Sequence, residues 1–166
     1  MFIILPEHMP SSICGDMIEI YKNNEDSAKG WRDTKPLEVR NISNQEGLNR
    51  VKLAIKYVNN AAVSFFGIHT YVELAEIVKW PTGSYQPPHT DDSSEATTFT
   101  SVTYLNDDFE GGETYFTTED LVVKPKVGKT ILFNGKKFEH EVKEIGDGIR
   151  YTLALWYSNN IMECMV

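Results

Sequence analysis

The chain has 166 residues and a formal net charge of −8 at pH 7, with 24 acidic side chains against 16 lysines and arginines. A chain of this length can bury a core without covalent staples and is typical of one domain, so we expect a single domain over 1–166. The negative charge argues against a nucleic-acid partner, because that affinity comes from basic side chains that neutralise phosphates.

Cysteines and chain termini give further limits. Cys14 and Cys164 are too few for a disulfide framework and neither has metal-binding spacing. The apolar start ends at Pro6 and lacks the basic residues of a signal peptide and the length of a membrane span. We therefore expect a cytoplasmic protein with no membrane partner. The oligomeric state stays open between a monomer and a weak homodimer.

Up to about residue 70 the apolar residues repeat at helical spacing. A first helix is expected to begin at Ser11 or Ser12 and to fray at 23–24, with an apolar stripe of Ile13, Met17, Ile18 and Tyr21. Residues 43–46 have the pattern of a capping box with Ser43 as the cap, and the helix that follows has a stripe of Leu48, Val51, Ile55, Val58 and Ala62. Both stripes favour packing against a sheet.

Between the two helices, residues 28–35 are polar and contain one large aromatic side chain, Trp31. Lids that close over ligands are usually loops, so Trp31 could act as a lid. A loop tryptophan can also simply pack against the body of the protein. Both interpretations stay open.

The remainder of the chain has short β-like runs separated by turn residues, which predict strands at 71–80, 98–105, 113–117, 120–124, 129–133, 140–144 and 149–157. Many short strands with regular turns favour a sandwich or barrel, including the double-sheet jelly roll.

Alternation along two of these strands indicates which side chains share a face. On 98–105 one face carries Thr98, Thr100, Val102 and Tyr104. On 149–157 one face carries Arg150, Thr152, Ala154 and Trp156, and the other carries Ile149, Tyr151, Leu153, Leu155 and Tyr157. A cation, two small residues and an indole make a poor core stripe, so we expect the Arg150 face to line a pocket. So bulky a strand is not expected at an exposed edge.

A candidate metal site is formed by His89, Asp91 and the distant His140. Residues i and i+2 of an extended segment project to the same side, so His89 and Asp91 can share one ion. Two imidazoles and one carboxylate suit Fe(II) and leave coordination positions open. The His-x-Asp pattern alone is weak, because chance produces it in about one chain of this size in five. Arg150, ten residues after His140, could hold an anionic co-substrate.

No lysine or arginine occurs between residues 81 and 123, although the stretch contains Asp91, Asp92, Glu95, Asp107, Asp108, Glu110, Glu113, Glu119 and Asp120. If these acids rim the site, their field favours a basic substrate. The alternative is that most of them are ordinary solvated turn residues.

A series of motifs runs in order through this half of the chain: 80–91 (WPTGSYQPPHTD), 100–106 (TSVTYLN), 109–116 (FEGGETYF), 125–128 (PKVG), 132–133 (LF), 140–142 (HEV) and 148–151 (GIRY). Together they resemble the catalytic domain of the prolyl 4-hydroxylase branch of the 2-oxoglutarate and Fe(II)-dependent dioxygenases. The amino-terminal helices of that family also fit the first part of the chain.

The resemblance implies a mostly β fold, in which a double-stranded β-helix (jelly-roll) core at 71–157 packs against a helical support region at 1–70, with a tail at 158–166. It implies Fe(II) held by His89, Asp91 and His140, and 2-oxoglutarate whose distal carboxylate is bound by Arg150 and Tyr104. Dioxygen as a co-substrate and ascorbate as a reductant are implied as well. The pocket-lining positions of the family correspond to Thr114 and Trp156.

The chain also departs from the family pattern. Trp80 stands nine residues before the first iron ligand, where close relatives often carry a tyrosine that binds the co-substrate, and an indole has no hydroxyl. Tyr85 is the nearest replacement, although its spacing is off by one. Thr97 stands where an arginine is common. Trp80 and Tyr85 are therefore both candidates for the cofactor site.

The implied reaction is hydroxylation of an unactivated C–H group, coupled to decarboxylation of 2-oxoglutarate to succinate and CO2. The resemblance favours a proline in a protein or peptide as the substrate. If the acidic stretch rims the site, this protein or peptide would be a basic one. The alternatives are a free amino acid or other small molecule, and a jelly-roll module that binds without catalysis. The complete ligand set and Arg150 argue against a module that binds without catalysis.

His8 and His69 have no partner at meaningful spacing and are expected to be structural.

Overall fold

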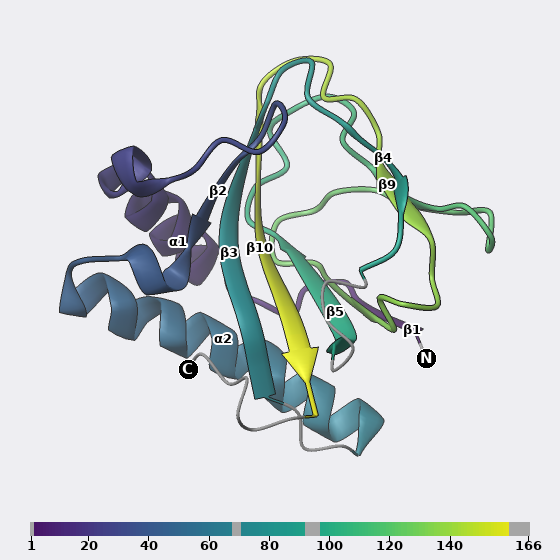
Figure 1. Ribbon diagram of the computed structural model, residues 1–166, viewed down its shortest axis with the longest axis horizontal. Helices are drawn as coiled ribbons and strands as arrows, with labels where there is room; N and C mark the ends of the chain where they lie inside the picture. Colours follow the sequence, from purple (N-terminus) through teal and green to yellow (C-terminus); the bar gives the residue numbers. More distant parts are fainter. Residues whose placement is uncertain (1, 68–70, 92–96, 160–166) are drawn as a thin grey trace.

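The computed structural model describes residues 2–67, 71–91 and 97–159. Two antiparallel sheets face each other, and two helices cover the outer side of the larger sheet (Figure 1). The strand order is β1-β8-β5-β10-β3-β2 in the larger sheet and β4-β9-β6-β7 in the smaller one. This is the mostly β jelly roll with amino-terminal helices that the sequence predicts.

The elements of the described residues have the following bounds. The helices are α1 (Ser11–Asn23) and α2 (Gln45–Phe66), with short 3₁₀ helices η1 (Glu25–Ser27) and η2 (Val39–Asn41). The larger sheet contains β1 (Phe2–Leu5), β2 (Lys35–Glu38), β3 (Tyr71–Pro81), β5 (Thr97–Tyr104), β8 (Thr130–Phe133) and β10 (Ile149–Ser158). The smaller sheet contains β4 (Gln86–His89), β6 (Thr114–Phe116), β7 (Leu121–Val123) and β9 (His140–Val142).

Helix α1 lies where the sequence predicts it, and its buried face consists of Cys14, Met17, Ile20 and Tyr21. The predicted capping box of α2 is wrong. Asn44, with extended backbone angles, is the cap, and its Oδ1 accepts a hydrogen bond of 2.6 Å from the Gly47 amide. An asparagine side chain satisfies a free amide of the first turn as well as a serine does, so it takes this role one residue later.

The main core lies between the helices and the larger sheet. The apolar face of β10 contributes Tyr151, Leu153, Leu155 and Tyr157, and α2 contributes Val51, Ala54, Ile55 and Val58. Ile149, at the start of β10, is the exception and stays 38% exposed. β10 pairs with β5 on one side and β3 on the other, which confirms that it is not an edge strand.

Three strands lie outside the ranges predicted from the sequence. β1 pairs with β8, β2 pairs with β3, and β4 pairs with β9. Each has four residues, and β2 and β4 contain prolines, so none shows the alternation by which strands are recognised. The amino-terminal part of the chain thus supplies both edge strands of the larger sheet as well as the helices.

A second core joins the two sheets at one end. It consists of Tyr104, Phe116, Val123, Ile131 and Phe133. The Phe116 and Phe133 rings meet edge to face with their centroids 5.0 Å apart. These side chains fill the space between the sheets at this end.

Two expectations about the whole chain can also be compared with the structure. Cys14 is a free thiol, and burial raises its pKa to about 11. Cys164 lies outside the described residues. No helix in the described part of the chain is long and apolar enough to cross a membrane.

Candidate active site

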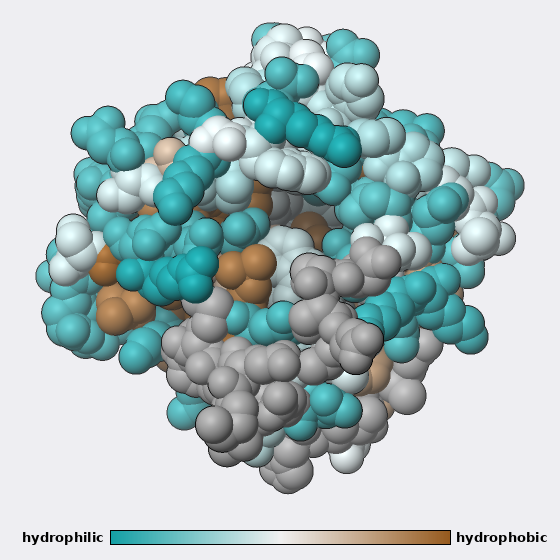
Figure 2. Space-filling model, viewed as in Figure 1, coloured by the Kyte–Doolittle hydropathy of each residue, from teal (hydrophilic) through white to brown (hydrophobic). Residues whose placement is uncertain are grey.

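A cavity of about 580 Å³ lies between the two sheets, and Figure 2 shows the surface hollowed at this place. The predicted pocket face of β10 lines it with Arg150, Thr152, Ala154 and Trp156, and β5 contributes Thr100 and Val102. The pocket face predicted on β10 is therefore confirmed, whereas Thr98 and Tyr104 of the corresponding face of β5 do not line the cavity.

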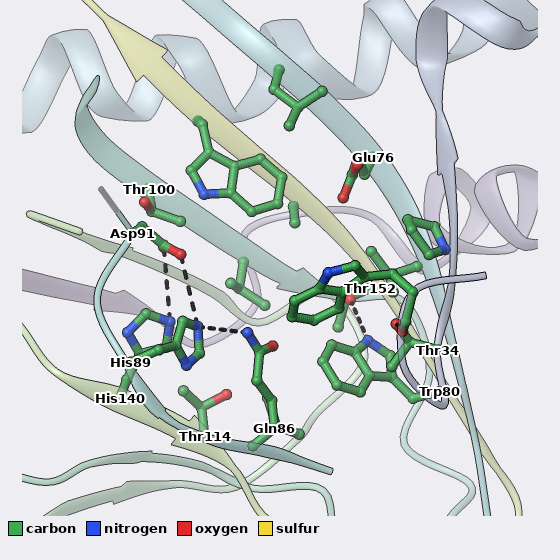
Figure 3. A pocket seen from close by; sticks show the side chains of 18 of the residues that line it. Thr34, Glu76, Trp80, Gln86, His89, Asp91, Thr100, Thr114, His140 and Thr152 are labelled. Atoms are coloured by element: carbon green, nitrogen blue, oxygen red, sulfur yellow. Dashed lines mark hydrogen bonds and ion pairs between the residues drawn. The ribbon is translucent and has the colours of Figure 1, made fainter. Parts of the chain in front are cut away.

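The three candidate metal ligands meet on one wall of this cavity (Figure 3). His89 ends β4 and lies directly opposite His140, which begins β9. Asp91 follows two residues after His89, and one ligand atom from each residue lies within 4.8 Å of the others. The Nε2 atom of each histidine is 3.8 Å from an oxygen of Asp91.

Both imidazoles are oriented by the backbone. The Nδ1–H of His89 donates to the Pro87 carbonyl at 2.9 Å, and that of His140 donates to the Phe138 carbonyl at 3.1 Å. With Nδ1 protonated, Nε2 carries the lone pair that a metal needs. Burial lowers the pKa of His140, which favours this neutral form. The side-chain amide of Gln86 donates to His89 Nε2 at 2.9 Å.

Asp91 is fixed by its contact with the loop after β8. Its backbone N–H donates to the Gly135 carbonyl at 3.0 Å. A Cβ at position 135 would lie 2.7 Å from Asp91 Cβ and 2.5 Å from Thr100 Oγ1, so this approach requires a glycine. Asp91 Oδ2 is buried without a hydrogen-bond partner, and a buried carboxylate oxygen without one is costly unless a cation binds it.

Arg150 is the second feature of the cavity. The side chain is 1% exposed, and its Nε and Nη1 atoms have no hydrogen-bond partner. Its guanidinium carbon lies 5.0 Å from the centre of the Trp80 ring and 5.2 Å from that of Tyr104. Gly112, with φ of 65°, makes room for it, because a Cβ there would lie 2.9 Å from Arg150 Cδ. A buried guanidinium with free donors is suited to a carboxylate.

The neighbours of Arg150 are polar but neutral. The Tyr104 hydroxyl lies 2.7 Å from Thr114 Oγ1, and burial raises the pKa of Tyr104, which keeps its proton in place. The Trp80 Nε1–H donates to Thr152 Oγ1 at 3.2 Å, so this donor is already used within the protein.

All the predicted site residues except Tyr85 and Tyr104 line the cavity, and Tyr104 is fully buried next to Arg150. Tyr85 is 53% exposed and is not among the lining residues. Trp31 lies at the cavity and is 48% exposed. His8 lies elsewhere, with Nε2 2.9 Å from the Tyr57 carbonyl, and His69 is outside the described residues.

The acidic stretch does not rim the cavity in the described residues. Apart from Asp91, its described members do not line it, and Asp107, for example, pairs with Lys126. Asp92 and Glu95 lie outside the described residues. The other acids at the cavity are Glu38 and Glu76, which the sequence analysis missed. Alternation on β3 could have found Glu76, because Leu74, Glu76, Val78 and Trp80 all line the cavity.

The donor set agrees with a metal centre. Two imidazole nitrogens and one carboxylate on one side of an open cavity form the facial triad of non-haem Fe(II) oxygenases. The unpartnered oxygen of Asp91 and the unpaired Arg150 fit a cation and an anion bound side by side. These features define an iron oxygenase with an anionic co-substrate, built on a jelly roll.

Sequence comparison gives the family. Residues 73–158 match the 2OG-Fe(II) oxygenase superfamily, and the chain belongs to it. Membership implies Fe(II), 2-oxoglutarate and dioxygen. Prolyl 3-hydroxylase 2 of Homo sapiens is 41% identical over 66 residues, which cover 36% of this chain and 9% of the relative. Prolyl 3-hydroxylase 1 of Gallus gallus is 38% identical over 66 residues, with the same coverage of both chains. The match thus spans a small part of these relatives.

Solved structures share the fold over nearly the whole chain. A prolyl-4-hydroxylase of Pseudomonas putida superposes with a TM-score of 0.76 at 17% identity, over 96% of this chain and 92% of that one. A prolyl hydroxylase of Trichoplax adhaerens, solved with a hypoxia inducible factor peptide fragment, gives 0.75 at 20% identity, over 95% and 83%. The viral collagen prolyl hydroxylase of Paramecium Bursaria Chlorella virus-1 gives 0.69 at 19% identity, over 95% and 94%.

Proposed function

We propose that this protein is a 2-oxoglutarate- and Fe(II)-dependent hydroxylase that acts on a proline of a peptide or protein. The observation that carries the proposal is one cavity in which His89, Asp91 and His140 converge within 4.8 Å and into which the unpaired, buried Arg150 also faces. The relatives and structural neighbours named above are prolyl hydroxylases, which favours proline as the target.

In this proposal His89, Asp91 and His140 hold the iron. The Nε2 atoms of the two histidines are turned toward Asp91 by their Nδ1–H bonds to the backbone. The Gln86 amide, which donates to His89 Nε2, would have to release this atom for the metal. Bound iron and 2-oxoglutarate supply the oxidising power that hydroxylates a C–H group, with succinate and CO2 as co-products. Ascorbate is the proposed reductant.

Arg150 binds the distal carboxylate of 2-oxoglutarate. Its fork of N–H donors matches the two oxygens of a carboxylate, and its charge has no acidic partner among the described residues. The Tyr104–Thr114 hydroxyl pair lies beside it and can donate to the same carboxylate. Trp80 contributes its ring face, since its N–H is bound to Thr152.

Aromatic side chains keep water away from the ligand side of the cavity. The Phe133 ring centre lies 4.8 Å and the Phe116 ring centre 5.7 Å from that of His140. Exclusion of water strengthens the electrostatic interactions there and protects reactive species from side reactions.

Substrate enters from the open side of the cavity, where Trp31 is exposed. Trp31 and Thr34 exchange two backbone hydrogen bonds of 2.9 and 3.0 Å, which form a tight turn. The role of Trp31 as a lid stays a prediction.

A search for oxidised products tests the substrate class. Protein extracts are incubated with the enzyme or with His89→Ala, and peptides that gain one oxygen atom are identified by mass spectrometry. We expect oxygen on prolines only with the unaltered enzyme. Oxygen found only on other residues, or only on free amino acids, would contradict the proline assignment.

A further inference from the structure

The cavity has a second charged region away from the metal ligands. Glu38 on β2 and Glu76 on β3 are direct cross-strand neighbours, and both line the cavity. Figure 3 shows Glu76 on the side of the cavity opposite His89, Asp91 and His140. Neither acid is needed to hold iron or 2-oxoglutarate in the proposed arrangement.

Only one of the two acids has a cationic partner. Glu38 forms an ion pair with the exposed Arg40. No described residue forms a hydrogen bond or ion pair with Glu76, which is partly buried. Burial and the negative charge of Glu38 raise the pKa of Glu76 to about 7, against the opposing effect of Arg40. Lys29 also lines the cavity, but its side chain is exposed and forms no ion pair with Glu76.

Aromatic side chains line the same cavity as the two acids. The three tryptophans of the chain, Trp31, Trp80 and Trp156, also line the cavity. The Trp80 ring faces Arg150 and the Trp31 ring faces Arg32, which leaves Trp156, on the strand next to β3, to face an ammonium or guanidinium group of a ligand.

The distance suits a peptide. Asp91 lies beside Thr100 on β5, and Glu76 lies on β3, with β10 between these strands. Two strand spacings separate the two sides by about 10 Å. An extended peptide covers about 10 Å in three residues.

We propose that Glu76, assisted by Glu38, binds a lysine or arginine side chain of the substrate, within about three residues of the hydroxylated proline. Glu76 is then a specificity-determining residue. This inference rests on the proposed function, because it assumes that the substrate is a peptide whose target proline lies at the metal ligands.

Pairs of peptides that differ in one residue test whether Glu76 binds a cationic side chain of the substrate. Each peptide has one central proline and carries either lysine or glutamine at one position from three residues before to three residues after it. Binding is measured anaerobically with Fe(II) and 2-oxoglutarate by tryptophan fluorescence, so that no turnover is needed. Glu76→Gln is compared with Glu119→Gln, which removes the same charge from an exposed site outside the cavity. Circular dichroism verifies the fold of both variants.

At one or more positions, the unaltered protein and Glu119→Gln should bind the lysine peptide about tenfold more tightly than its glutamine counterpart, which corresponds to about 1.4 kcal/mol. Glu76→Gln should lose most of this preference. Equal affinities for every pair, or a preference that survives in Glu76→Gln, would overturn the inference. Free L-lysine that binds as tightly as the best peptide would also overturn it.

The same peptides separate this inference from the proposed function. Hydroxylation is measured in air by mass spectrometry. Peptides that bind with the Glu76-dependent preference but gain no oxygen would contradict proline hydroxylation and leave the cation site standing. If lysine and glutamine peptides are hydroxylated with equal efficiency and bound with equal affinity, the cation site is contradicted and proline hydroxylation stands.

Discussion

Arg150 is the largest of the fully buried side chains in the described residues, and its guanidinium contacts two aromatic rings without an anionic partner. Burying a charge without a partner is costly. The protein therefore keeps Arg150 at the expense of stability, as expected for a group whose partner is a ligand.

Replacing Arg150 with methionine should abolish 2-oxoglutarate binding and leave the ligand-free protein at least as stable. In the unaltered protein, 2-oxoglutarate at a hundred times its Kd stabilises by about 2.7 kcal/mol, or roughly 5–10 °C in Tm. Anaerobic thermal unfolding with Fe(II) measures both effects. The control is Lys52→Met, which removes an exposed cation from α2 and should keep the full rise in Tm with 2-oxoglutarate. The same rise in Arg150→Met would show that the arginine is misassigned.

Glu76 gives a prediction for stability against pH. Its pKa is raised from 4.5 to about 7 in the fold, so the folded protein holds this proton more tightly than the unfolded chain does. Stability from this group is fully present below about pH 4.5 and is lost as the pH rises toward 7, by up to about 3 kcal/mol.

Glu76→Gln carries no titrating group and escapes this loss. In denaturant unfolding without metal or 2-oxoglutarate, the variant should match the unaltered protein at about pH 4 and exceed it by about 1–3 kcal/mol at pH 8. A variant that is less stable at pH 8 would mean that the Glu76 carboxylate has a partner in the fold.

At the level of elements, the metal ligands are positioned by three segments: strand β4, strand β9 and the loop that follows β8. Gly135 is the closest contact of this arrangement, because a methyl group there would meet Asp91 and Thr100. Gly135→Ala should displace Asp91 and weaken Fe(II) binding roughly 10–100-fold, the range seen when partners of metal ligands are changed. Anaerobic calorimetric titration measures the affinity. Gly15→Ala on α1, where no atom lies within 4 Å of the new methyl group, should bind Fe(II) normally. Unchanged affinity in Gly135→Ala would contradict this role.

The start of α2 gives a matched pair of variants. Asn44→Ala removes the side chain that caps the Gly47 amide and should lower the free energy of unfolding by about 1 kcal/mol. Ser43→Ala should change it little, because Ser43 is not the cap. Chemical denaturation of both proteins measures the difference, and the opposite order would restore the capping box that the sequence suggests.

These elements also show what a sequence can reveal. The alternation of Arg150, Thr152, Ala154 and Trp156 predicted a cavity wall, because the pattern depends on one strand alone. Glu38 could not be placed, because its position depends on the pairing of β2 with β3, which no local pattern encodes. The position of Tyr85 outside the cavity could not be predicted either, because spacing from His89 does not tell which way a turn directs its side chain.

For the whole molecule, the jelly roll brings residues that are far apart in sequence to one cavity. His89 and His140 are register partners across β4 and β9, while Arg150 lies on the opposite sheet. The motifs predicted this convergence only through their resemblance to the family, since spacing in the chain does not determine sheet order. The division into 1–70, 71–157 and 158–166, the cytoplasmic location and the oligomeric state stay predictions.

The central claim is that this cavity uses iron and 2-oxoglutarate for catalysis. Its most direct test is the yield of succinate from purified protein with Fe(II), ascorbate, 2-oxoglutarate and air. His8→Ala, outside the cavity, is the control for His89→Ala. We predict iron-dependent succinate formation by the unaltered protein and by His8→Ala, and none above background by His89→Ala. Equal succinate from the unaltered protein and His89→Ala would contradict the claim.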